Sequence, residues 1–181
     1  MKERIDECVK HCRSFNVAID VGAHEGLYSI EMSRHFGRVY SFEPISMNFI
    51  DLERNTRNYP SINVYNFGVS DSERQEVFDI SGKSNGFHIS NNATVAEVCN
   101  LVTLDDFFEK QQDVDFIKID VEGHEAAVLR GAQRLIRVNR PVIMIEEKFD
   151  PELTASKLLE SWGYAQVWRK KRDRVFVCKS S

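Results

Sequence analysis

The sequence has few cysteines, and they are scattered along the chain. Cys8, Cys12, Cys99 and Cys178 lack the spacing of a disulfide framework, and the first two share one face of a predicted helix. No second ligand pair follows the 8–12 segment at zinc-site spacing, which argues against a structural zinc ion. We therefore expect reduced thiols and a cytoplasmic protein.

Long apolar runs and an excess of charge of one sign are also absent. No run approaches the ~20 residues of a membrane helix, and the first dozen residues are too charged for a signal peptide. The 24 Lys and Arg and 28 Asp and Glu residues are mixed along the chain and give a net charge of -4. We expect no membrane or nucleic-acid partner, and a small-molecule or oligosaccharide substrate.

What the sequence does contain is an alternation of short apolar runs with helical patterns. Its 181 residues, 42% of them hydrophobic, suit a single domain over 1–181. The runs are nearly continuous, as in parallel strands covered on both faces, and the alternation is typical of right-handed βαβ units. We predict an α/β fold with a three-layer, Rossmann-like, mostly parallel sheet. Its strands are expected at 17–19, 39–42, 62–66, 116–119 and 142–145, and its helices at 27–36, 45–58 and 125–138.

Three further segments complete the predicted organisation. An N-terminal helix is expected within residues 1–15, and an antiparallel C-terminal hairpin at 164–168 and 175–177, joined by a basic, solvated turn. Residues 70–100 are rich in Ser, Asn, Gly and charge, without a clear helix. They are either a disordered insertion or a lid on the acceptor side, and their position before a core strand favours the lid.

The first two strands end in residues that indicate an adenosine site. The first runs into Asp20-Val21-Gly22-Ala23-His24-Glu25-Gly26, and the second ends at Glu43. Small residues allow a tight turn and close approach to a ligand, and the acid can accept hydrogen bonds from ribose hydroxyls. Acids in the loop would repel a pyrophosphate, so the pattern favours the cationic S-adenosylmethionine over a dinucleotide.

The later strands also end in acids, namely Asp120 with Glu122, and Glu146 with Glu147. In an open parallel sheet, ligands bind outside the carboxyl ends of the strands. The sequence therefore predicts a polar crevice at this edge.

Five segments together resemble a known family. The runs VAIDVGAHEG, VYSFEP, TLDDFF, FIKIDVEGHEAAVLRGA and RPVIMIEE, in this order, are similar to the FkbM family of S-adenosylmethionine-dependent O-methyltransferases. The match extends from about Val17 to Glu147. The resemblance implies a class I methyltransferase fold and methyl transfer to a hydroxyl, often of a sugar or secondary metabolite.

The resemblance also implies roles for residues of the cofactor site. Asp20, Gly22, Ala23 and Gly26 would line the methionine and adenosine parts, Glu43 would hold the ribose, and Ser46 would follow it at a helix start. Gly68 and Val69 would lie near the adenine. Asp120 would hold the cofactor's ammonium if it is not a metal ligand. His24, where the family commonly has Asn, would contact the ligand or cap a helix. The expected cofactor-binding set is Asp20, Gly22, Ala23, His24, Glu25, Gly26, Glu43, Ser46, Gly68, Val69 and Asp120.

Two mechanisms for activating the acceptor are open. His124, near Asp120 and Glu122, is the candidate general base, while Lys118 would orient the acceptor or pair with a carboxylate. Alternatively, Asp120 and Glu146, joined by Glu122 or Glu147, would hold Mg²⁺ or Mn²⁺ and lower the pKa of the hydroxyl.

Three classes of function remain. The leading one is a carbohydrate O-methyltransferase; the others are a methyltransferase for a natural product, protein or nucleic acid, and a non-catalytic S-adenosylmethionine-binding module. The acceptor, the oligomeric state and membership in a larger multi-domain enzyme are left open by the sequence.

Overall fold

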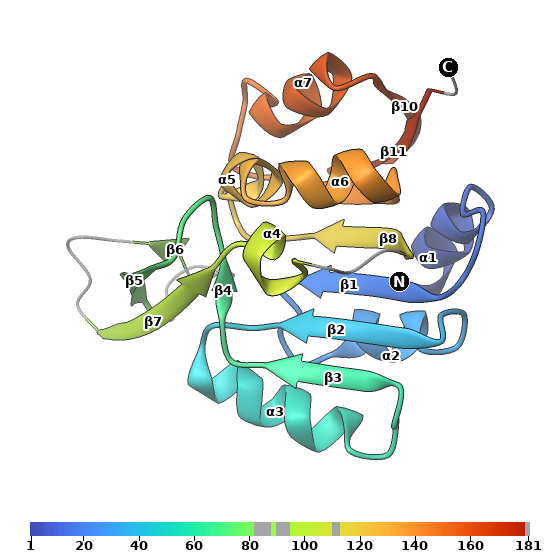
Figure 1. Cartoon of the computed structure of the whole chain (residues 1–181). Helices are drawn as coiled ribbons and strands as arrows, with labels where there is room; N and C mark the ends of the chain where they lie inside the picture. Colours follow the sequence, from blue (N-terminus) through green and yellow to red (C-terminus); the bar gives the residue numbers. More distant parts are fainter. Residues whose placement is uncertain (82–87, 90–94, 110–112, 180–181) are drawn as a thin grey trace.

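A computed structural model describes residues 1–81, 88–89, 95–109 and 113–179 of the chain (Figure 1). Its main sheet has seven strands in the order β10-β11-β9-β8-β1-β2-β3, with β9, β8, β1, β2 and β3 parallel. The strands are β1 (Val17–Val21), β2 (Arg38–Phe42), β3 (Ile62–Tyr65), β8 (Val114–Ile119), β9 (Val142–Glu146), β10 (Tyr164–Lys170) and β11 (Asp173–Cys178). The predicted mostly parallel α/β sheet and its antiparallel C-terminal hairpin are confirmed.

Helices cover both faces of this sheet, because successive strand residues point to opposite sides. On one face, α1 (Lys2–Val9) and α2 (Leu27–Met32) pack against Ala18 and Phe116. On the other, α5 (Glu125–Arg130), α6 (Gln133–Asn139) and α7 (Thr154–Ser161) pack against Ile19 and Ile117. The third helix, α3 (Ser46–Thr56), lies next to β3.

The predicted helix over 125–138 is instead two helices, α5 and α6. They separate at Gly131, where a Cβ would lie 1.9 Å from the carbonyl oxygen of Ser70. Close backbone packing therefore requires glycine here. The N-terminal helix also ends earlier than expected, at Val9.

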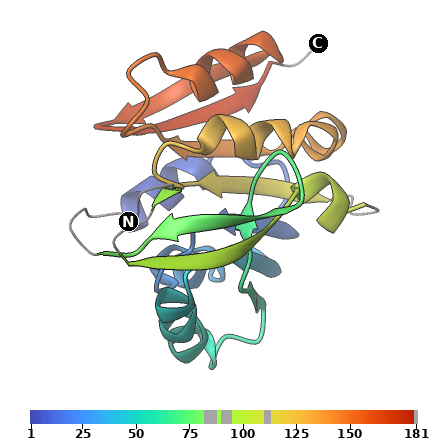
Figure 2. The same ribbon diagram turned by 90° about the vertical axis from the view of Figure 1, so that its left-hand side faces the viewer.

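A second, four-stranded sheet is built largely from the segment predicted to be a lid or a disordered insertion. Its order is β4-β7-β5-β6, and it stands in front of the carboxyl ends of the main strands (Figure 2). The strands are β4 (Gly68–Val69), β5 (Arg74–Asp79), β6 (His88–Ile89) and β7 (Ala96–Val102). This position is the one expected of a lid over the acceptor side of the site, and the lid role stays a prediction. Parts of the segment, 82–87 and 90–94, lie outside the described residues.

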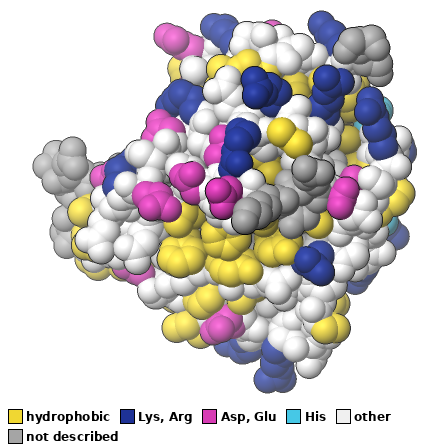
Figure 3. Space-filling model, in the orientation of Figure 1, with side chains coloured by type: hydrophobic (Ala, Val, Ile, Leu, Met, Phe, Trp, Pro, Cys, Tyr) yellow, Lys and Arg dark blue, Asp and Glu magenta, His cyan; other side chains and the backbone are white. Residues whose placement is uncertain are grey.

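Aromatic side chains gather around the short helix α4 (Leu104–Phe107). Tyr40, Phe42 and Tyr65 of the sheet contact Phe107 and Phe108 through ring pairs 4.8–6.2 Å apart. In Figure 3 hydrophobic side chains form a patch on the face that carries α4. Within the described part of the chain, no helix is long and apolar enough to span a bilayer.

Candidate active site

The candidate site begins where β1 and β8 end side by side. Gly22 follows β1 with φ +77°, and its amide donates to the carbonyl of Phe42 at 3.0 Å. A Cβ at this position would lie 1.9 Å from the carbonyl oxygen of Asp120. Only glycine therefore combines the left-handed backbone with this close approach between the two strand ends.

Glu43, at the end of β2, organises the loop after β1. Its carboxylate accepts the amide of His24 at 2.9 Å, the amide of Ile45 at 3.1 Å and the side-chain amide of Asn48 at 3.2 Å. Burial raises the pKa of Glu43, while these donors act in the opposite direction. Glu43, which is expected to bind the ribose, therefore also fixes the conformation of the loop after β1.

The expected capping role of His24 is wrong. The N-cap of α2 is Gly26, with φ +86°, and His24 lies two residues earlier with φ +51°. The neighbouring Ala23 is buried, and its amide donates to the carbonyl of Phe42. The carbonyl of Glu25 accepts a hydrogen bond from the side-chain amide of Asn55 at 2.9 Å.

Behind the loop lies a buried ion pair between β1 and β8. Asp20 and Lys118 are 0% and 2% exposed, and the Lys118 Nζ lies 3.1 Å from Asp20 Oδ1. Ser29 donates to Asp20 Oδ2 at 2.7 Å, and Lys118 also donates to the carbonyl of Gly22 at 2.9 Å. Burial alone would lower the pKa of Lys118, but the charges of Asp20 and Asp120 raise it. Lys118 thus takes the expected carboxylate partner.

This burial changes the role expected for Asp20. Its carboxylate has no exposed surface; one oxygen lies in the ion pair with Lys118 and the other accepts from Ser29, so it does not face the crevice. We propose that Asp20 acts as a positioning residue, which fixes Lys118 and through it the Gly22 backbone.

A second carboxyl group lies next to this pair. Asp120 Oδ2 is 3.6 Å from Lys118 Nζ, and Asp120 is hydrogen-bonded to the side chain of Glu146 at the end of β9. Burial and the negative charge of Asp120 raise the pKa of Glu146 to about 7. Near neutral pH, Glu146 is therefore present in both its protonated and its ionised form.

Three further residues complete this corner, and no sequence pattern pointed to any of them. Arg4 of α1 forms an ion pair with Asp173, the first residue of β11, and is hydrogen-bonded to Tyr28 of α2. Lys118 Nζ lies 5.0 Å from the centre of the Tyr28 ring. An antiparallel strand begins where its parallel neighbours end, which is why Asp173 reaches this edge.

The remaining predicted catalytic residues face other partners. His124 Nε2 is 2.9 Å from Ser70 Oγ, and burial, followed by the charge of Arg74, lowers the pKa of His124. Glu122 pairs with Lys148 at 3.3 Å. The structure therefore brings Asp120, Lys118 and Glu146 together, but gives His124 and Glu122 separate contacts.

The outer members of the predicted cofactor set lie at the start of α3 and in the second sheet. Ser46 donates its amide to Glu97 of β7 at 3.0 Å. Gly68 packs so closely that a Cβ would lie 2.3 Å from Leu101 Cδ2, and Val69 is buried beside it. Their expected place near the adenine stays a prediction.

The residues at this edge do not fit the expected metal ion. Asp120 and Glu146 bond to each other, Glu122 pairs with Lys148, and Glu147 with Arg174 at 3.1 Å. Among the described residues, a three-ligand grouping occurs only at Asp6, Glu31 and His35, on α1, on α2 and just after α2. We therefore assign no metal-dependent step.

Comparison with known families gives the class of protein. The sequence profile of the methyltransferase FkbM domain matches residues 20–165. The chain belongs to the FkbM methyltransferase family. This match contains the Gly22 loop, Glu43 and both carboxyl groups of the Asp120–Glu146 pair, so the family's sequence pattern coincides with the carboxyl edge of the sheet.

Individual proteins resemble the chain in sequence or in fold. The hexuronic acid methyltransferase AglP of Haloferax volcanii is 27% identical over 168 residues, which is 90% of this chain and 69% of AglP. The crystal structure of an FkbM methyltransferase from Methylobacillus flagellatus KT has a TM-score of 0.69 at 20% identity, covering 90% of this chain and 43% of that one. A Streptococcus mutans protein solved with SAH has a TM-score of 0.60 at 8% identity, covering 97% and 94%. The FkbM chain thus spans less than half of the Methylobacillus protein.

Proposed function

We propose that the chain transfers the methyl group of S-adenosylmethionine to a hydroxyl of a sugar or glycan. The observation that carries the proposal is the hydrogen-bonded Asp120–Glu146 pair beside the Gly22 loop. The name of AglP, a hexuronic acid methyltransferase, supports a sugar acceptor. The SAH complex of a protein with the same fold supports the cofactor.

The corner around Asp120 has the charges that the methionine part of this cofactor requires. A zwitterion carries an ammonium and a carboxylate, and this corner offers carboxylates next to a guanidinium. We propose that Asp120 takes the ammonium and Arg4 the carboxylate. Arg4 has 28% of its side chain exposed and still has donors left after pairing with Asp173 through Nε.

In the proposed reaction, an acceptor oxygen attacks the methyl carbon as the bond from sulfur to that carbon breaks. The oxygen–carbon bond forms, the electron pair of the breaking bond stays on sulfur, and SAH leaves. The hydroxyl proton passes to Glu146, whose raised pKa makes it an acceptor near neutral pH. We propose Glu146 in place of His124 as the base, because Glu146 lies beside Asp120, the proposed partner of the cofactor's ammonium, whereas His124 contacts Ser70 next to β4.

The test uses labelled S-adenosylmethionine with a panel of neutral and acidic mono- and oligosaccharides. Wild-type protein, Glu146→Gln and His124→Ala are compared, after calorimetry shows that each binds SAH. We expect wild type to label a saccharide hydroxyl, Glu146→Gln to lose the label, and His124→Ala to retain it.

Other outcomes separate the alternatives. SAH binding without labelling of any saccharide would contradict the sugar proposal, and panels of peptides, natural products and RNA would then test the other acceptors. Labelling of a uronate carboxyl at equal rates in wild type and Glu146→Gln would contradict hydroxyl transfer, since a carboxylate needs no base. Loss of labelling in His124→Ala alone would restore His124 as the base.

A further inference from the structure

The second sheet is joined to the rest of the chain by two short connections. The chain enters this sheet through residues 70–71, just after β4, and leaves β7 through residues 103–105, at the start of α4. We call these two connections the stem of the second sheet. Ser70 donates its amide to the carbonyl of Val102, the last residue of β7, at 2.9 Å, so the two connections lie side by side. In Figure 1 the first of them reaches up to α5.

The first connection is held by three residues of the segment around α5. His124 Nε2 lies 2.9 Å from the Oγ of Ser70, which has no exposed surface. Arg130 pairs with the carboxylate of Asp71 at 3.3 Å. The close approach of Gly131 to the carbonyl of Ser70 adds a backbone contact. His124 and Gly131 cap the two ends of α5, seven positions or about two turns apart, so one face of α5 lies against the stem.

Asp105 fixes the second connection to the same region. Its amide donates to the carbonyl of Gly131 at 2.8 Å. Its carboxylate accepts the amide of Arg134 at 2.9 Å and the amide of Leu135 at 2.8 Å, both at the start of α6. Both connections of the stem are therefore attached to the segment that contains α5 and the start of α6.

The imidazole of His124 is neutral near neutral pH. Burial, followed by the positive charge of Arg74, lowers the pKa of His124; Arg130 acts in the same direction, while Asp71 and Glu76 oppose it. Asp71 lies between the two guanidinium groups, 3.2 Å from that of Arg74 and 3.3 Å from that of Arg130. A neutral imidazole can therefore form a hydrogen bond with the stem without adding a third positive charge beside them.

The apolar contacts beneath the second sheet are limited. A small buried cluster joins Ile45, just before α3, to Phe78 of β5 and to Cys99 and Leu101 of β7. The polar contacts of the stem therefore contribute to the placement of this sheet.

We infer that His124 is a positioning residue, which holds the second sheet in front of the carboxyl edge of the main strands through Ser70. The second sheet stands before that edge in Figure 2. The functional part of the inference rests on the methyl transfer proposed above, whose acceptor must enter at this edge. His124 then affects the binding of the acceptor and not the removal of its proton. The segment EGHEAAVLRGA, residues 122–132, thereby has a role distinct from that of the Asp120–Glu146 pair.

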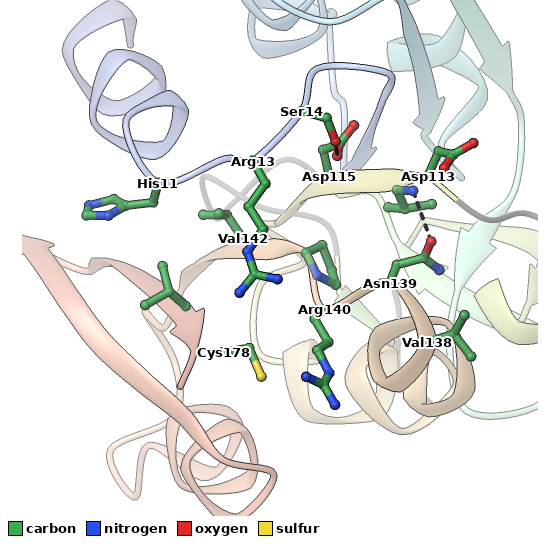
Figure 4. A pocket seen from close by; sticks show the side chains of 13 residues that line it. His11, Arg13, Ser14, Asp113, Asp115, Val138, Asn139, Arg140, Val142 and Cys178 are labelled. Carbon is green, nitrogen blue, oxygen red and sulfur yellow. Dashed lines mark hydrogen bonds between the residues drawn. The ribbon is translucent and has the colours of Figure 1, made fainter. Parts of the chain in front are cut away.

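Hydrogen–deuterium exchange tests the structural part without any substrate. Exchange of the amides of β5, β7 and β8 is compared in wild type, His124→Ala, Ser70→Ala and the double variant. His124→Gln is included because its side-chain amide can reach the position of Nε2. The matched control is His11→Ala. His11 is also partly buried, but it lines a pocket at the amino ends of β8 and β9, at the edge opposite the second sheet (Figure 4).

We expect the amides of β5 and β7 to exchange about fivefold faster or more in His124→Ala, with those of β8 unchanged, because the buried hydroxyl of Ser70 loses a partner. Ser70→Ala should act similarly, and the double variant should add little to either. His124→Gln should restore most of the protection, and His11→Ala should leave β5 and β7 unchanged. Equal exchange in His124→Ala and wild type would overturn the inference, as would an equal acceleration in β8 or in His11→Ala.

The functional part is measured with a saccharide that the wild type labels. His124→Ala should raise the KM for this acceptor about fivefold or more while kcat stays within about twofold, and His124→Gln should restore the KM. A loss of kcat at unchanged KM would overturn the positioning role. If no saccharide is labelled, the proposed acceptor is wrong, whereas the exchange measurement still supports or overturns the attachment of the second sheet through His124.

Discussion

Replacing Lys118 with methionine tests the buried ion pair most directly. The substitution keeps an unbranched side chain of similar length but removes the charge. It leaves Asp20, which has no exposed surface, with Ser29 as its remaining side-chain donor, and it leaves the carbonyl of Gly22 without the Nζ donor. A buried carboxylate without its cation is strongly disfavoured.

The expected loss of stability follows from the distances between Lys118 Nζ and the two aspartate carboxylates. At an effective dielectric constant of 20, the contacts of Nζ at 3.1 Å and 3.6 Å each contribute about 5 kcal/mol of attraction. Desolvation of the buried charges offsets much of this, and breaking such pairs typically destabilises proteins by about 3–5 kcal/mol. We expect Lys118→Met to lower the free energy of unfolding by that amount, a large share of the ~5–15 kcal/mol of a typical domain.

Urea unfolding followed by circular dichroism measures the change, with the double variant Asp20→Asn/Lys118→Met as the matched control. Because the double variant buries no uncompensated charge at Asp20, it should unfold at higher urea than Lys118→Met alone. A free energy of unfolding for Lys118→Met within about 0.5 kcal/mol of wild type would refute this account. So would a double variant less stable than Lys118→Met.

Four other results are expected. The value of kcat/KM should rise as the pH passes through about 7, because Glu146 of the free enzyme must lose its proton to act as base. Glu146→Gln should lose this pH dependence and about 100-fold in kcat/KM, and an unchanged pH profile would contradict the assignment. Gly22→Ala should lower the free energy of unfolding by at least about 2 kcal/mol, measured in urea, since its methyl would meet Asp120 at 1.9 Å and φ is +77°. Glu43→Gln should weaken SAH binding about tenfold by calorimetry, and an equal affinity would remove the carboxylate from the cofactor site. Chelation with EDTA should leave the rate unchanged, whereas a loss restored by Mg²⁺ would revive the metal mechanism.

The order of strands and helices could be predicted from the sequence because each signal is local. Short apolar runs and helical spacing each lie within a few neighbouring residues, and the parallel sheet follows from their alternation. The break at Gly131 could not be predicted, since it depends on the approach of Ser70 from another element.

The candidate site was predictable only where acids follow strands. Asp120 and Glu146 were found in this way, since the carboxyl ends of parallel strands meet at one edge. Arg4 and Asp173 could not be predicted, because their contact joins residues 169 positions apart and the charge pattern around Asp173 is typical of a solvated turn. Whether Asp20 faces a ligand or the interior depends on Lys118 and Ser29, which sequence spacing does not reveal.

The position of β11 between β9 and β10 has a consequence for how the protein is made. During synthesis β9 emerges before β11, so it has an open edge until the residues up to Cys178 are available. The Arg4–Asp173 contact, which joins the first helix to the last strand, must also form late. Substitutions that slow the docking of β11 should therefore lower the yield of folded protein more than they lower the activity of the protein that does fold. The open edge of β9 is the surface through which we expect nascent chains to aggregate.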